Sequence, residues 1–355
     1  MSVIDKYTVL GMMSGTSLDG LDLALCEFTL KDGNWNFQIL NAETLPYPSD
    51  ILNRLREAQN LNALDFVRLH KFYGDYLGKA ANNFLQNKKK PDFIASHGHT
   101  VFHAPAERLT FQIGDGAFIA AQTGITTVAD FRTMNTALHG QGAPLVPIGD
   151  ELLFSGEDYC LNLGGFANVS YRIGNKNRIA YDICPANYVL NFLAKKQNLP
   201  YDFEGKISRS GEIDADLLQK MNSADYFSQK PPKSLGREFV EETVLAELEK
   251  SSLSLPSQMR TYTEHIAEQI ALSLNSLPHG SLMITGGGAH NKFLIETITK
   301  KLKHKLVLPN SQIIDFKEAL IFAFLGLLRM RNEANCLASV TGARQNNSGG
   351  QVFLV

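Results

Sequence analysis

The amino-terminal part of the chain alternates apolar and polar residues in short runs, which is the pattern of half-buried β-strands. The alternation predicts strands at Tyr7–Gly11 and Asp22–Phe28, and a third strand at Trp35–Leu40 after the turn Lys-Asp-Gly-Asn. Successive strands joined by short turns pair in an antiparallel meander. We therefore expect the chain to begin with a three-stranded meander.

Helices and strands alternate after this meander. The segment Ala63–Leu85 has apolar residues every three or four positions, which predicts an amphipathic helix. Beyond it the pattern predicts a strand at Asp92–Ser96, a hairpin near Leu109–Ile113, a helix at Ala117–Thr123 and a short strand at Thr126–Ala129.

The same order begins again at Tyr159. Strands are predicted at Tyr159–Leu163, Asn168–Ile173 and Arg178–Asp182, and they form a second meander. Helices are predicted at Asn187–Lys195, Arg237–Ser251 and Pro256–Leu274, followed by a strand at Ser281–Thr285 and a helix from about His290. A last helix, at Phe316–Arg331, is apolar on most faces. Two halves with one order of elements favour an internal duplication over an unrelated α/β protein that uses similar turns twice.

Length and composition narrow the class of protein. A chain of 355 residues corresponds to about two domains. With 34 basic and 36 acidic residues the net charge is −2, and 44% of the residues are apolar, so neither a nucleic-acid binder nor a disordered chain is indicated. The four cysteines form no CxxC pair, and the longest apolar run, Ala319–Leu325, is too short to span a membrane. We expect a soluble, cytoplasmic protein with no membrane partner.

The first turn, from Gly11 to Asp22, reads Gly-Met-Met-Ser-Gly-Thr-Ser-Leu-Asp-Gly-Leu-Asp. Its glycines let backbone approach a ligand, its hydroxyls can donate to phosphate oxygens, and Asp19 or Asp22 could hold a metal ion through water. It lacks both the Walker ending and the GxGxxG fingerprint. A phosphate-binding turn and an ordinary hairpin turn are equally compatible with this segment alone.

Two further glycine clusters favour the phosphate-binding interpretation. The segment Leu163–Asn168, with Gly164 and Gly165, recurs at the matching point of the second half. A third cluster, Gly286-Gly287-Gly288, lies between a predicted strand and a helix, where backbone can pack on a base and a helix amino terminus favours negative charge.

Several charged or titratable residues could carry chemistry. Asp182 at the predicted end of a strand could act as a general base, although an aspartate near a helix start is commonplace. His97 and His99 would share one strand face, as in metal hydrolases, but the other histidines lack ligand spacing. Arg132 could bind a carboxylate through two hydrogen bonds or form only a surface ion pair.

Together these motifs resemble the actin/hexokinase/heat-shock-protein ATPase superfamily and, more narrowly, the anhydro-N-acetylmuramic acid kinase family. The resemblance runs from Gly11 to Ala343. It rests on Gly15–Gly20, Asp130–Arg132, Gly140–Pro147, Asn162–Asn168, Gly236–Glu238, Thr285–Asn291 and Thr341–Ala343. It implies a duplicated ribonuclease-H-like α/β fold with two lobes, 1–150 and 151–355, around a central nucleotide cleft, with the last helix and tail able to pack back on the first lobe.

The resemblance also implies a reaction. The family opens the 1,6-anhydro bridge of anhydro-N-acetylmuramic acid with water and transfers the γ-phosphoryl of ATP to O6, giving N-acetylmuramic acid 6-phosphate and ADP in peptidoglycan recycling. Asp182 would be the general base, and His97, Arg132 and Glu318 would place the sugar. Mg²⁺ would bridge the phosphates, with Asp19 as an additional contact, and the protein would be a homodimer. The residues matching the ATP-binding segments are Gly15, Thr16, Ser17, Leu18, Asp19, Gly20, Leu21, Asp22, Gly164, Gly165, Asn168, Gly286, Gly287 and Gly288.

The chain departs from the usual pattern of this family. The usual segment after the base is Thr-Gly-Pro-Gly-Asn, but Ile183-Cys184-Pro185-Ala186-Asn187 stands here. His99 replaces a usual glutamine, Asn135 a usual aspartate and His139 a usual glycine. Two alternatives follow, a catalytically altered nucleotide-binding protein and a kinase of a related anhydro-sugar, besides the metal hydrolase.

Overall fold

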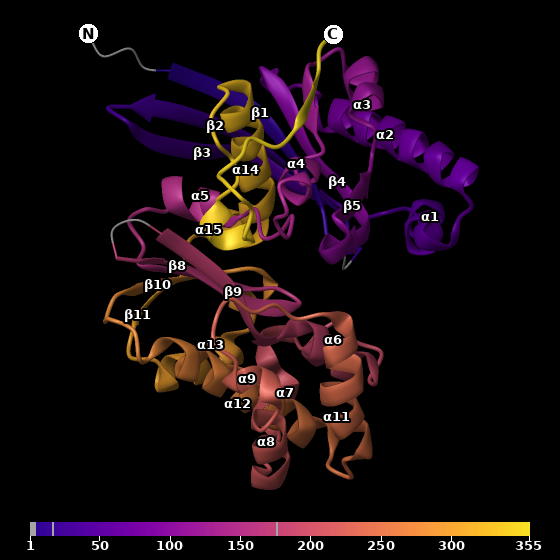
Figure 1. Cartoon of the computed structure of the whole chain (residues 1–355). Coiled ribbons are helices and arrows are strands. Elements are labelled where there is room, and N and C mark those ends of the chain that lie inside the picture. The colour runs from indigo at the N-terminus through magenta and orange to yellow at the C-terminus, as the bar shows by residue number, and fades with distance from the viewer. Residues whose placement is uncertain (1–4, 16–17, 175–176) are drawn as a thin grey trace. The chain divides into compact units, whose positions relative to one another are not determined.

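The computed structural model describes residues 5–15, 18–174 and 177–355. The chain divides into two compact units (Figure 1). Unit 1 comprises residues 1–155 and 316–355, and unit 2 comprises residues 156–315. The carboxyl-terminal segment therefore returns to the unit built by the amino-terminal half.

Unit 1 contains a mixed seven-stranded sheet. The predicted meander is confirmed, with β1, β2 and β3 antiparallel, and β4 runs parallel to β1 on the other side. The order is β12-β6-β4-β1-β2-β3, and β5 pairs with β4. The strands are β1 (Asp5–Ser14), β2 (Leu21–Lys31), β3 (Asn34–Leu45), β4 (Phe93–Ala104), β5 (Leu109–Ile113), β6 (Thr127–Ala129) and β12 (Gln351–Phe353).

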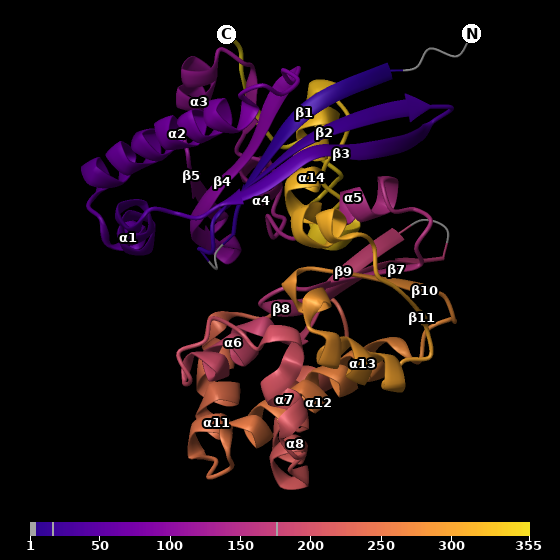
Figure 2. The ribbon, with the colours of Figure 1, turned by 180° about the vertical axis from the view of Figure 1, so that it is seen from behind.

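Small residues bring α14 (Ser311–Met330) close to this sheet. A Cβ at Gly11 of β1 would lie 2.0 Å from the carbonyl oxygen of Ala319, and one at Gly326 would lie 2.6 Å from the Cβ of Ala95. The run Ala319–Leu325 is buried, as its sequence predicted. The other helices of the unit, some visible from behind in Figure 2, are α1 (Ser49–Glu57), α2 (Ala63–Leu85), α3 (Gly116–Thr123), α4 (Thr133–Ala137), α5 (Pro147–Leu152) and α15 (Ala338–Thr341).

Unit 2 repeats the topology of unit 1. Its sheet has the order β11-β10-β7-β8-β9, with an antiparallel meander β7-β8-β9 and parallel neighbours β10 and β11. When β5 and β12 are left out, the strand order of the sheet in unit 1 is β6-β4-β1-β2-β3. Each sheet thus places its five strands in the order fifth, fourth, first, second and third along the chain. The duplicated, ribonuclease-H-like α/β fold is thus confirmed. The strands are β7 (Tyr159–Leu163), β8 (Phe166–Ile173), β9 (Asn177–Pro185), β10 (Ser281–Thr285) and β11 (Lys305–Val307).

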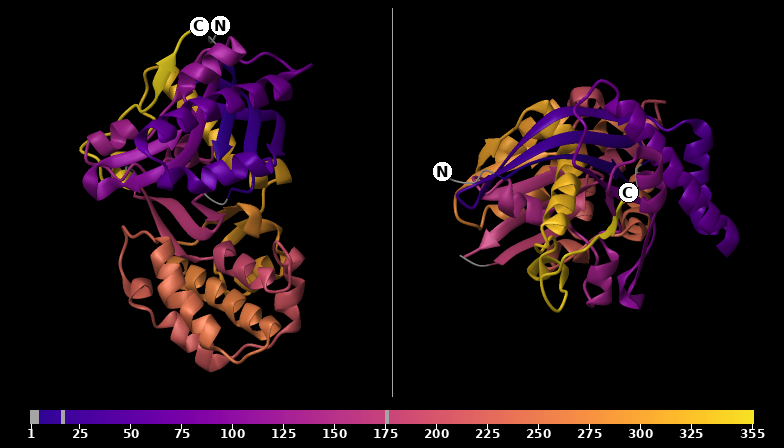
Figure 3. Two further views of the ribbon diagram at one scale, coloured as in Figure 1. Left: turned by 90° about the vertical axis from the view of Figure 1, so that its right-hand side faces the viewer. Right: turned by 90° about the horizontal axis from the view of Figure 1, so that it is seen from above.

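Helices pack against this second sheet around the largely buried α12 (Leu255–Leu274) (Figure 3). The helix predicted at 237–251 is interrupted by π-helical residues 240–245. The helix after the third glycine cluster begins at Lys292, because Asn291 caps it by accepting from the amide of Leu294 at 3.0 Å. The remaining helices are α6 (Asn187–Lys195), α7 (Lys206–Ser210), α8 (Ala215–Asn222), α9 (Asp225–Ser228), α10 (Arg237–Phe239), α11 (Ala246–Lys250) and α13 (Lys292–Lys301).

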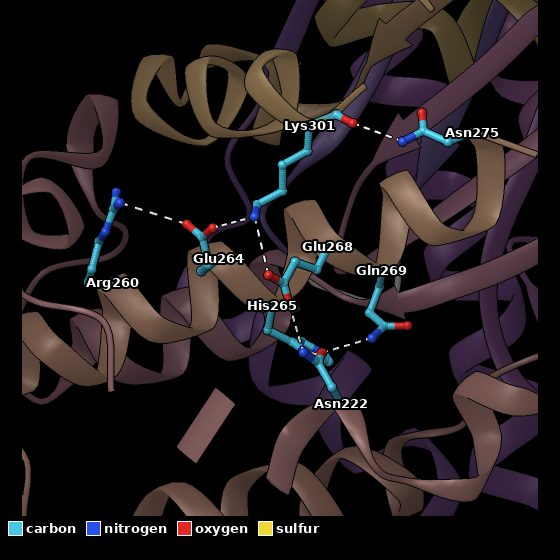
Figure 4. Close-up of polar contacts among 8 residues, drawn as sticks. All are labelled: Asn222, Arg260, Glu264, His265, Glu268, Gln269, Asn275 and Lys301. Atoms are coloured by element: carbon cyan, nitrogen blue, oxygen red, sulfur yellow. Dashed lines mark hydrogen bonds and ion pairs between the residues drawn. The ribbon is translucent and has the colours of Figure 1, made fainter. Parts of the chain in front are cut away.

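A polar network ties α12 to α8 and α13 (Figure 4). Lys301 of α13 forms ion pairs with Glu264 and Glu268 of α12 at 2.6 and 3.2 Å. On α12, the Nδ1 atom of buried His265 lies 2.6 Å from the Oδ1 atom of Asn222 of α8.

Within the described residues, no helix is long and apolar enough to cross a membrane.

Candidate active site

The first glycine-rich turn joins β1 and β2 of unit 1. Ser14 pairs with Leu21 at the end of the strands, and the amide of Leu18 donates to the carbonyl of Gly15 at 3.2 Å. Leu18 has φ +60°, a left-handed conformation that L-residues rarely adopt. Thr16 and Ser17 lie outside the described residues. The side chain of Leu21 is buried, so Leu21 offers a ligand only its backbone.

Two carboxylates flank this turn. The Oδ1 atom of Asp22 accepts the hydroxyl proton of Thr44 at 2.6 Å. Asp19 is exposed, and its carboxylate has no hydrogen-bonding partner in the described part of the chain. Carboxylate oxygens are the protein ligands that Mg²⁺ prefers, directly or through water. Asp19 thus fits the expected water-mediated contact, and Asp22 is already engaged in fixing the meander.

Arg132, at the start of α4, is held by two of its nitrogens. Its Nε atom donates to Nε2 of His97 at 3.0 Å, and its Nη1 atom donates to the carbonyl of Gly142 at 2.7 Å. Burial lowers the pKa of Arg132 to about 10, and the nearby Glu318 opposes this shift. Among the described residues nothing bonds to Nη2, so a fixed cationic edge remains for a ligand carboxylate.

His97 supports Arg132 through both of its ring nitrogens. Nδ1 lies 2.9 Å from the carbonyl of Gly98 and must donate, so Nε2 is the acceptor for Arg132. The ring is buried beside Phe322, at 4.6 Å between centroids, and burial lowers its pKa well below the ordinary value. A neutral His97 with both nitrogens engaged orients Arg132 and has no free nitrogen with which to contact the sugar.

Glu318 of α14 lies in the electrostatic field of Arg132. Burial raises the pKa of its carboxyl, while Arg132 and Lys317 lower it by a smaller amount. No described residue donates a hydrogen bond to Glu318. The three predicted sugar-binding residues are therefore brought together within unit 1, with Glu318 balancing the charge of Arg132.

Asn135 shows why one departure from the family pattern is tolerated. Its Nδ2 atom donates to Sγ of Cys336 at 3.0 Å and to Oγ1 of Thr341 at 2.9 Å, and its Oδ1 atom accepts from the amide of Gly142 at 2.8 Å. An aspartate could not donate. The amide thus belongs to a buried network. His139, another departure, is exposed, and its Nε2 lies 2.9 Å from Nη2 of Arg344.

The other two glycine clusters meet within unit 2. The Nδ2 atom of Asn187 donates to the carbonyl of Leu163, directly before the turn Gly164-Gly165. A Cβ at Gly286, which has φ +83°, would lie 2.5 Å from Oδ1 of Asn162. A Cβ at Gly288 would lie 2.7 Å from that of Leu163, whereas Gly287 has no atom closer than 3.9 Å. Two of these glycines are therefore needed for close packing of the turns, and Gly287 leaves backbone accessible.

Asp182 lies inside β9, opposite Asn168 of β8, and the strand continues to Pro185. The prediction that the strand ends at Asp182 was wrong. Burial raises the pKa of the carboxyl, and a hydrogen bond from the amide of Leu235 to Oδ2, at 2.9 Å, opposes that shift. No cation contributes to the shift of its pKa. A carboxylate with raised proton affinity and one oxygen held is suited to general-base catalysis.

The altered segment after Asp182 keeps hydrogen bonds to the glycine turn. Ala186, where the family has glycine, has φ −127° and ψ −100°, so it is not in the left-handed region but lies outside the common α and β regions. Its amide donates to the carbonyl of Gly165 at 2.8 Å, and the amide of Asn187 donates to Gly164 at 3.1 Å. Cys184 is buried, and burial raises the pKa of its thiol. These substitutions leave Asn187 attached to the glycine turn and Asp182 paired with Asn168 in the sheet.

The metal-hydrolase alternative requires a ligand set, and none is assembled in the described residues. The regular alternation expected at His97 and His99 is broken by a bulge and by Gly98 at φ +71°. His97 contacts Arg132, whereas Nδ1 of His99 lies 3.1 Å from Oγ of Ser14. The two rings thus serve different neighbours.

The sequence pattern of the family described as "Anhydro-N-acetylmuramic acid kinase" matches residues 7–355. The chain belongs to this family. A protein of that name from Sulfurovum sp. (strain NBC37-1) is 36% identical over 373 residues, covering 99% of this chain and all of that one. Another from Vibrio cholerae is 35% identical, covering 98% and 99%. Family membership replaces the metal-hydrolase alternative.

Two solved structures of low similarity to this chain hold a nucleotide analogue. The activator of 2-hydroxyisocaproyl-CoA dehydratase from Clostridium difficile, with bound ADPNP, has a TM-score of 0.42 and 14% identity, covering 92% of this chain and 97% of that chain. A ROK family glucokinase from Streptomyces griseus, in complex with glucose and AMPPNP, has a TM-score of 0.39 and 12% identity, covering 89% and 97%.

Proposed function

We propose that this protein is an ATP-dependent kinase that hydrolytically opens the 1,6-anhydro ring of anhydro-N-acetylmuramic acid and phosphorylates O6 in peptidoglycan recycling. The observation that carries the proposal is the family match over residues 7–355, with relatives covered from end to end. The products are N-acetylmuramic acid 6-phosphate and ADP.

Asp182 takes the role of general base. It accepts one proton from a water molecule while the oxygen of that water forms a bond to the anomeric carbon of the sugar. The bond from this carbon to O6 breaks, and O6 attacks the γ-phosphorus of ATP, displacing ADP. The raised pKa of Asp182 supports this role, because a stronger base removes the proton more readily.

Arg132 and Glu318 take the role of placing the sugar. The unengaged Nη2 edge of Arg132 suits the lactyl carboxylate, since guanidinium and carboxylate match in planar geometry. Glu318 can accept from a sugar hydroxyl, because no described residue donates to it. His97 contributes through Arg132, whose guanidinium it orients.

The three glycine clusters take the role of binding ATP. The segment Gly15–Asp22 and the turn Gly164-Gly165, with Asn168, contact phosphates, and Gly286–Gly288 supports the adenosine. Asp19 would help to hold Mg²⁺ through water, and the metal would supply positive charge to offset the charge that develops on the phosphates. We also propose a cytoplasmic homodimer with no nucleic-acid or membrane partner, as the family resemblance implies.

The proposal is tested by measuring ADP release with ATP, Mg²⁺ and anhydro-N-acetylmuramic acid. Release is expected only with the sugar present. In water labelled with oxygen-18, the label should enter the C1 hydroxyl and not the phosphate, because water attacks carbon. ATP binding without sugar-dependent release would instead identify a catalytically altered nucleotide-binding protein. Release with a different anhydro-sugar only would identify a kinase of that sugar.

A further inference from the structure

The segment 226–235 of unit 2 is bonded to Asp182 at three points. The hydroxyl of Tyr226 donates to the carbonyl of Asp182 at 2.6 Å, and the amide of Asp182 donates to the carbonyl of Lys233 at 3.2 Å. The amide of Leu235 donates to Oδ2 of the Asp182 carboxylate at 2.9 Å. One segment therefore fixes the amide, the carbonyl and one carboxylate oxygen of Asp182.

The side chain of Lys233 closes this segment on itself. Its Nζ atom donates to the carbonyl of Tyr226 at 3.1 Å and lies 4.5 Å from the centroid of the Tyr226 ring. This ring is 7% exposed and packs on Phe227 and Phe239, at 5.7 and 5.4 Å between centroids. Lys233 thus joins the buried start of the segment, at Tyr226, to the end that carries the amide of Leu235.

Lys233 acts on Asp182 through these bonds and not through its charge. The pKa of Asp182 is shifted by burial and by a backbone hydrogen bond, with no contribution from the lysine. Two other titratable groups interact electrostatically with Asp182, the phenol of Tyr226 and the thiol of Cys184, and burial raises the pKa of both. The residue opposite on β8, Asn168, does not titrate. These neighbours therefore stay uncharged near neutral pH.

The second carboxylate oxygen of Asp182, Oδ1, accepts no hydrogen bond from any residue in the described part of the chain, and the side chain is only partly buried. Oδ1 is therefore the oxygen that can take a proton from water. We propose that Lys233 is a positioning residue for Asp182. Through its bond to Tyr226, it holds the segment where the amide of Leu235 binds Oδ2 and leaves Oδ1 available to the attacking water. The inference rests on the proposed function of Asp182 as the general base.

The proposal is tested first without turnover, by carbon-13 NMR of protein labelled at aspartate. The Asp182 carboxyl signal is assigned by its loss in Asp182→Asn, and its pKa is read from a pH titration. The hydrogen bond from Leu235 lowers this pKa, so loosening the segment in Lys233→Met should raise it. Lys233→Arg keeps a donor for the carbonyl of Tyr226 and should restore the wild-type pKa. An unchanged pKa in Lys233→Met, or no rescue by arginine, would overturn the proposal.

The matched control is Lys230→Met. Lys230 lies in the same segment, is exposed and has no partner among the described residues, so its loss should leave the pKa of Asp182 unchanged. Lys233→Met should fold, because the carbonyl of Tyr226 also accepts from the amide of Gln229 at 3.2 Å and stays paired. Thermal melts check both variants. An equal rise in pKa in Lys230→Met would assign the effect to charge and overturn the proposal.

Steady-state kinetics then test the effect on catalysis. In Lys233→Met, kcat should fall about tenfold, because a base must be held within bonding distance of the proton that it removes. The KM values for ATP and the sugar should stay nearly constant, and the acidic limb of the pH profile of kcat should move to higher pH. A rise in KM with kcat unchanged would overturn the proposal.

Tyr226→Phe gives a second, independent variant. It keeps the ring and the carbonyl that bind Lys233 and loses only the hydrogen bond to the carbonyl of Asp182, so kcat should again fall with KM nearly constant. A kcat equal to that of the wild type would contradict the proposal. Where the wild type shows no sugar-dependent turnover, the proposed function fails, and the pKa of Asp182 in Lys233→Met alone decides whether Lys233 positions this carboxylate.

Discussion

Asp182 in unit 2 and Glu318 in unit 1 are two partly buried carboxyls with opposite surroundings. Burial raises the pKa of both. At Asp182 only a hydrogen bond from the amide of Leu235 opposes this rise in pKa. At Glu318 the positive charges of Arg132 and Lys317 oppose it. A carboxylate balanced by cations holds them in place, and one without cations keeps its affinity for a proton. Burial acts on both carboxyls in the same direction, so it is their neighbours that distinguish the proposed base from the proposed binding residue.

Asp182→Asn should show the largest effect. The amide oxygen of asparagine can still accept from Leu235, so the fold should survive, but the base is lost. We expect kcat to fall about 10³-fold, within the range of general-base contributions, with little change in the KM for ATP. Steady-state kinetics and a thermal melt measure both. A kcat within tenfold of the wild-type value would remove Asp182 from the role of base.

Arg132→Lys tests the sugar-binding residues of unit 1, where Arg132 is one of the cations that oppose the rise in the pKa of Glu318. Lysine keeps the charge but carries its donors on a single nitrogen, so it lacks the planar fork that reaches His97, Gly142 and a ligand carboxylate in different directions. The KM for the sugar should rise about 10- to 100-fold, as expected for a lost charged hydrogen bond, while the KM for ATP stays nearly constant. An anhydro-sugar lacking the lactyl carboxylate serves as control, because the variant and the wild type should handle it alike. Equal losses on both sugars would contradict the proposed contact.

Gly286→Ala tests whether unit 2 needs its glycine turn for packing. Gly286 has φ +83° and too little space for a Cβ, whereas Gly174, at φ +59°, has nothing within 4 Å of one. Alanine at Gly174 should cost about 1–2 kcal/mol of unfolding free energy. Alanine at Gly286 should cost about 1–2 kcal/mol more, because its Cβ also overlaps Asn162. Urea unfolding measures both, and equal losses would show that the turn relaxes.

Local pattern predicted many elements, because periodicity is a property of the segment itself. The ends of α2, β7, α6 and β10 agree with the predictions at Ala63–Leu85, Tyr159–Leu163, Asn187–Lys195 and Ser281–Thr285. The strand β12 was not predicted: it is three residues long and is held by pairing with β6, more than 200 positions earlier in the chain.

The sequence predicted which residues belong to the candidate site, but it did not predict the contacts between them. The hydrogen bond from Arg132 to His97 joins residues that are 35 positions apart, and no periodicity in the sequence encodes it. The hydrogen bonds among the side chains of Tyr73, Tyr47, Ser14 and His99 likewise join four separate segments. The adjacent motif Ser96–His99 indicated that the histidines matter, and only the bulge at Gly98 shows that they act separately.

The smallest predicted effect is on stability. Because burial raises the pKa of Asp182, the folded state binds its proton more tightly than the unfolded state, so its ionisation costs stability. This cost is absent below the ordinary pKa, near 3.8, and grows as pH rises through the raised pKa. Asp182→Asn should therefore be more stable than the wild type at pH 7, by about 1 kcal/mol, and should lose this advantage at pH 3–4.

Glu318→Gln gives the matched measurement, and its gain at pH 7 should be smaller, because removing the carboxylate also leaves Arg132 with less compensating charge. Burial lowers the pKa of His265 to about 3, so stability is also lost as pH falls below about 6.5. That loss is shared by both variants and the wild type, so it cancels in the differences. A larger gain from Glu318→Gln than from Asp182→Asn would reverse the assignment of balanced and unbalanced carboxyls.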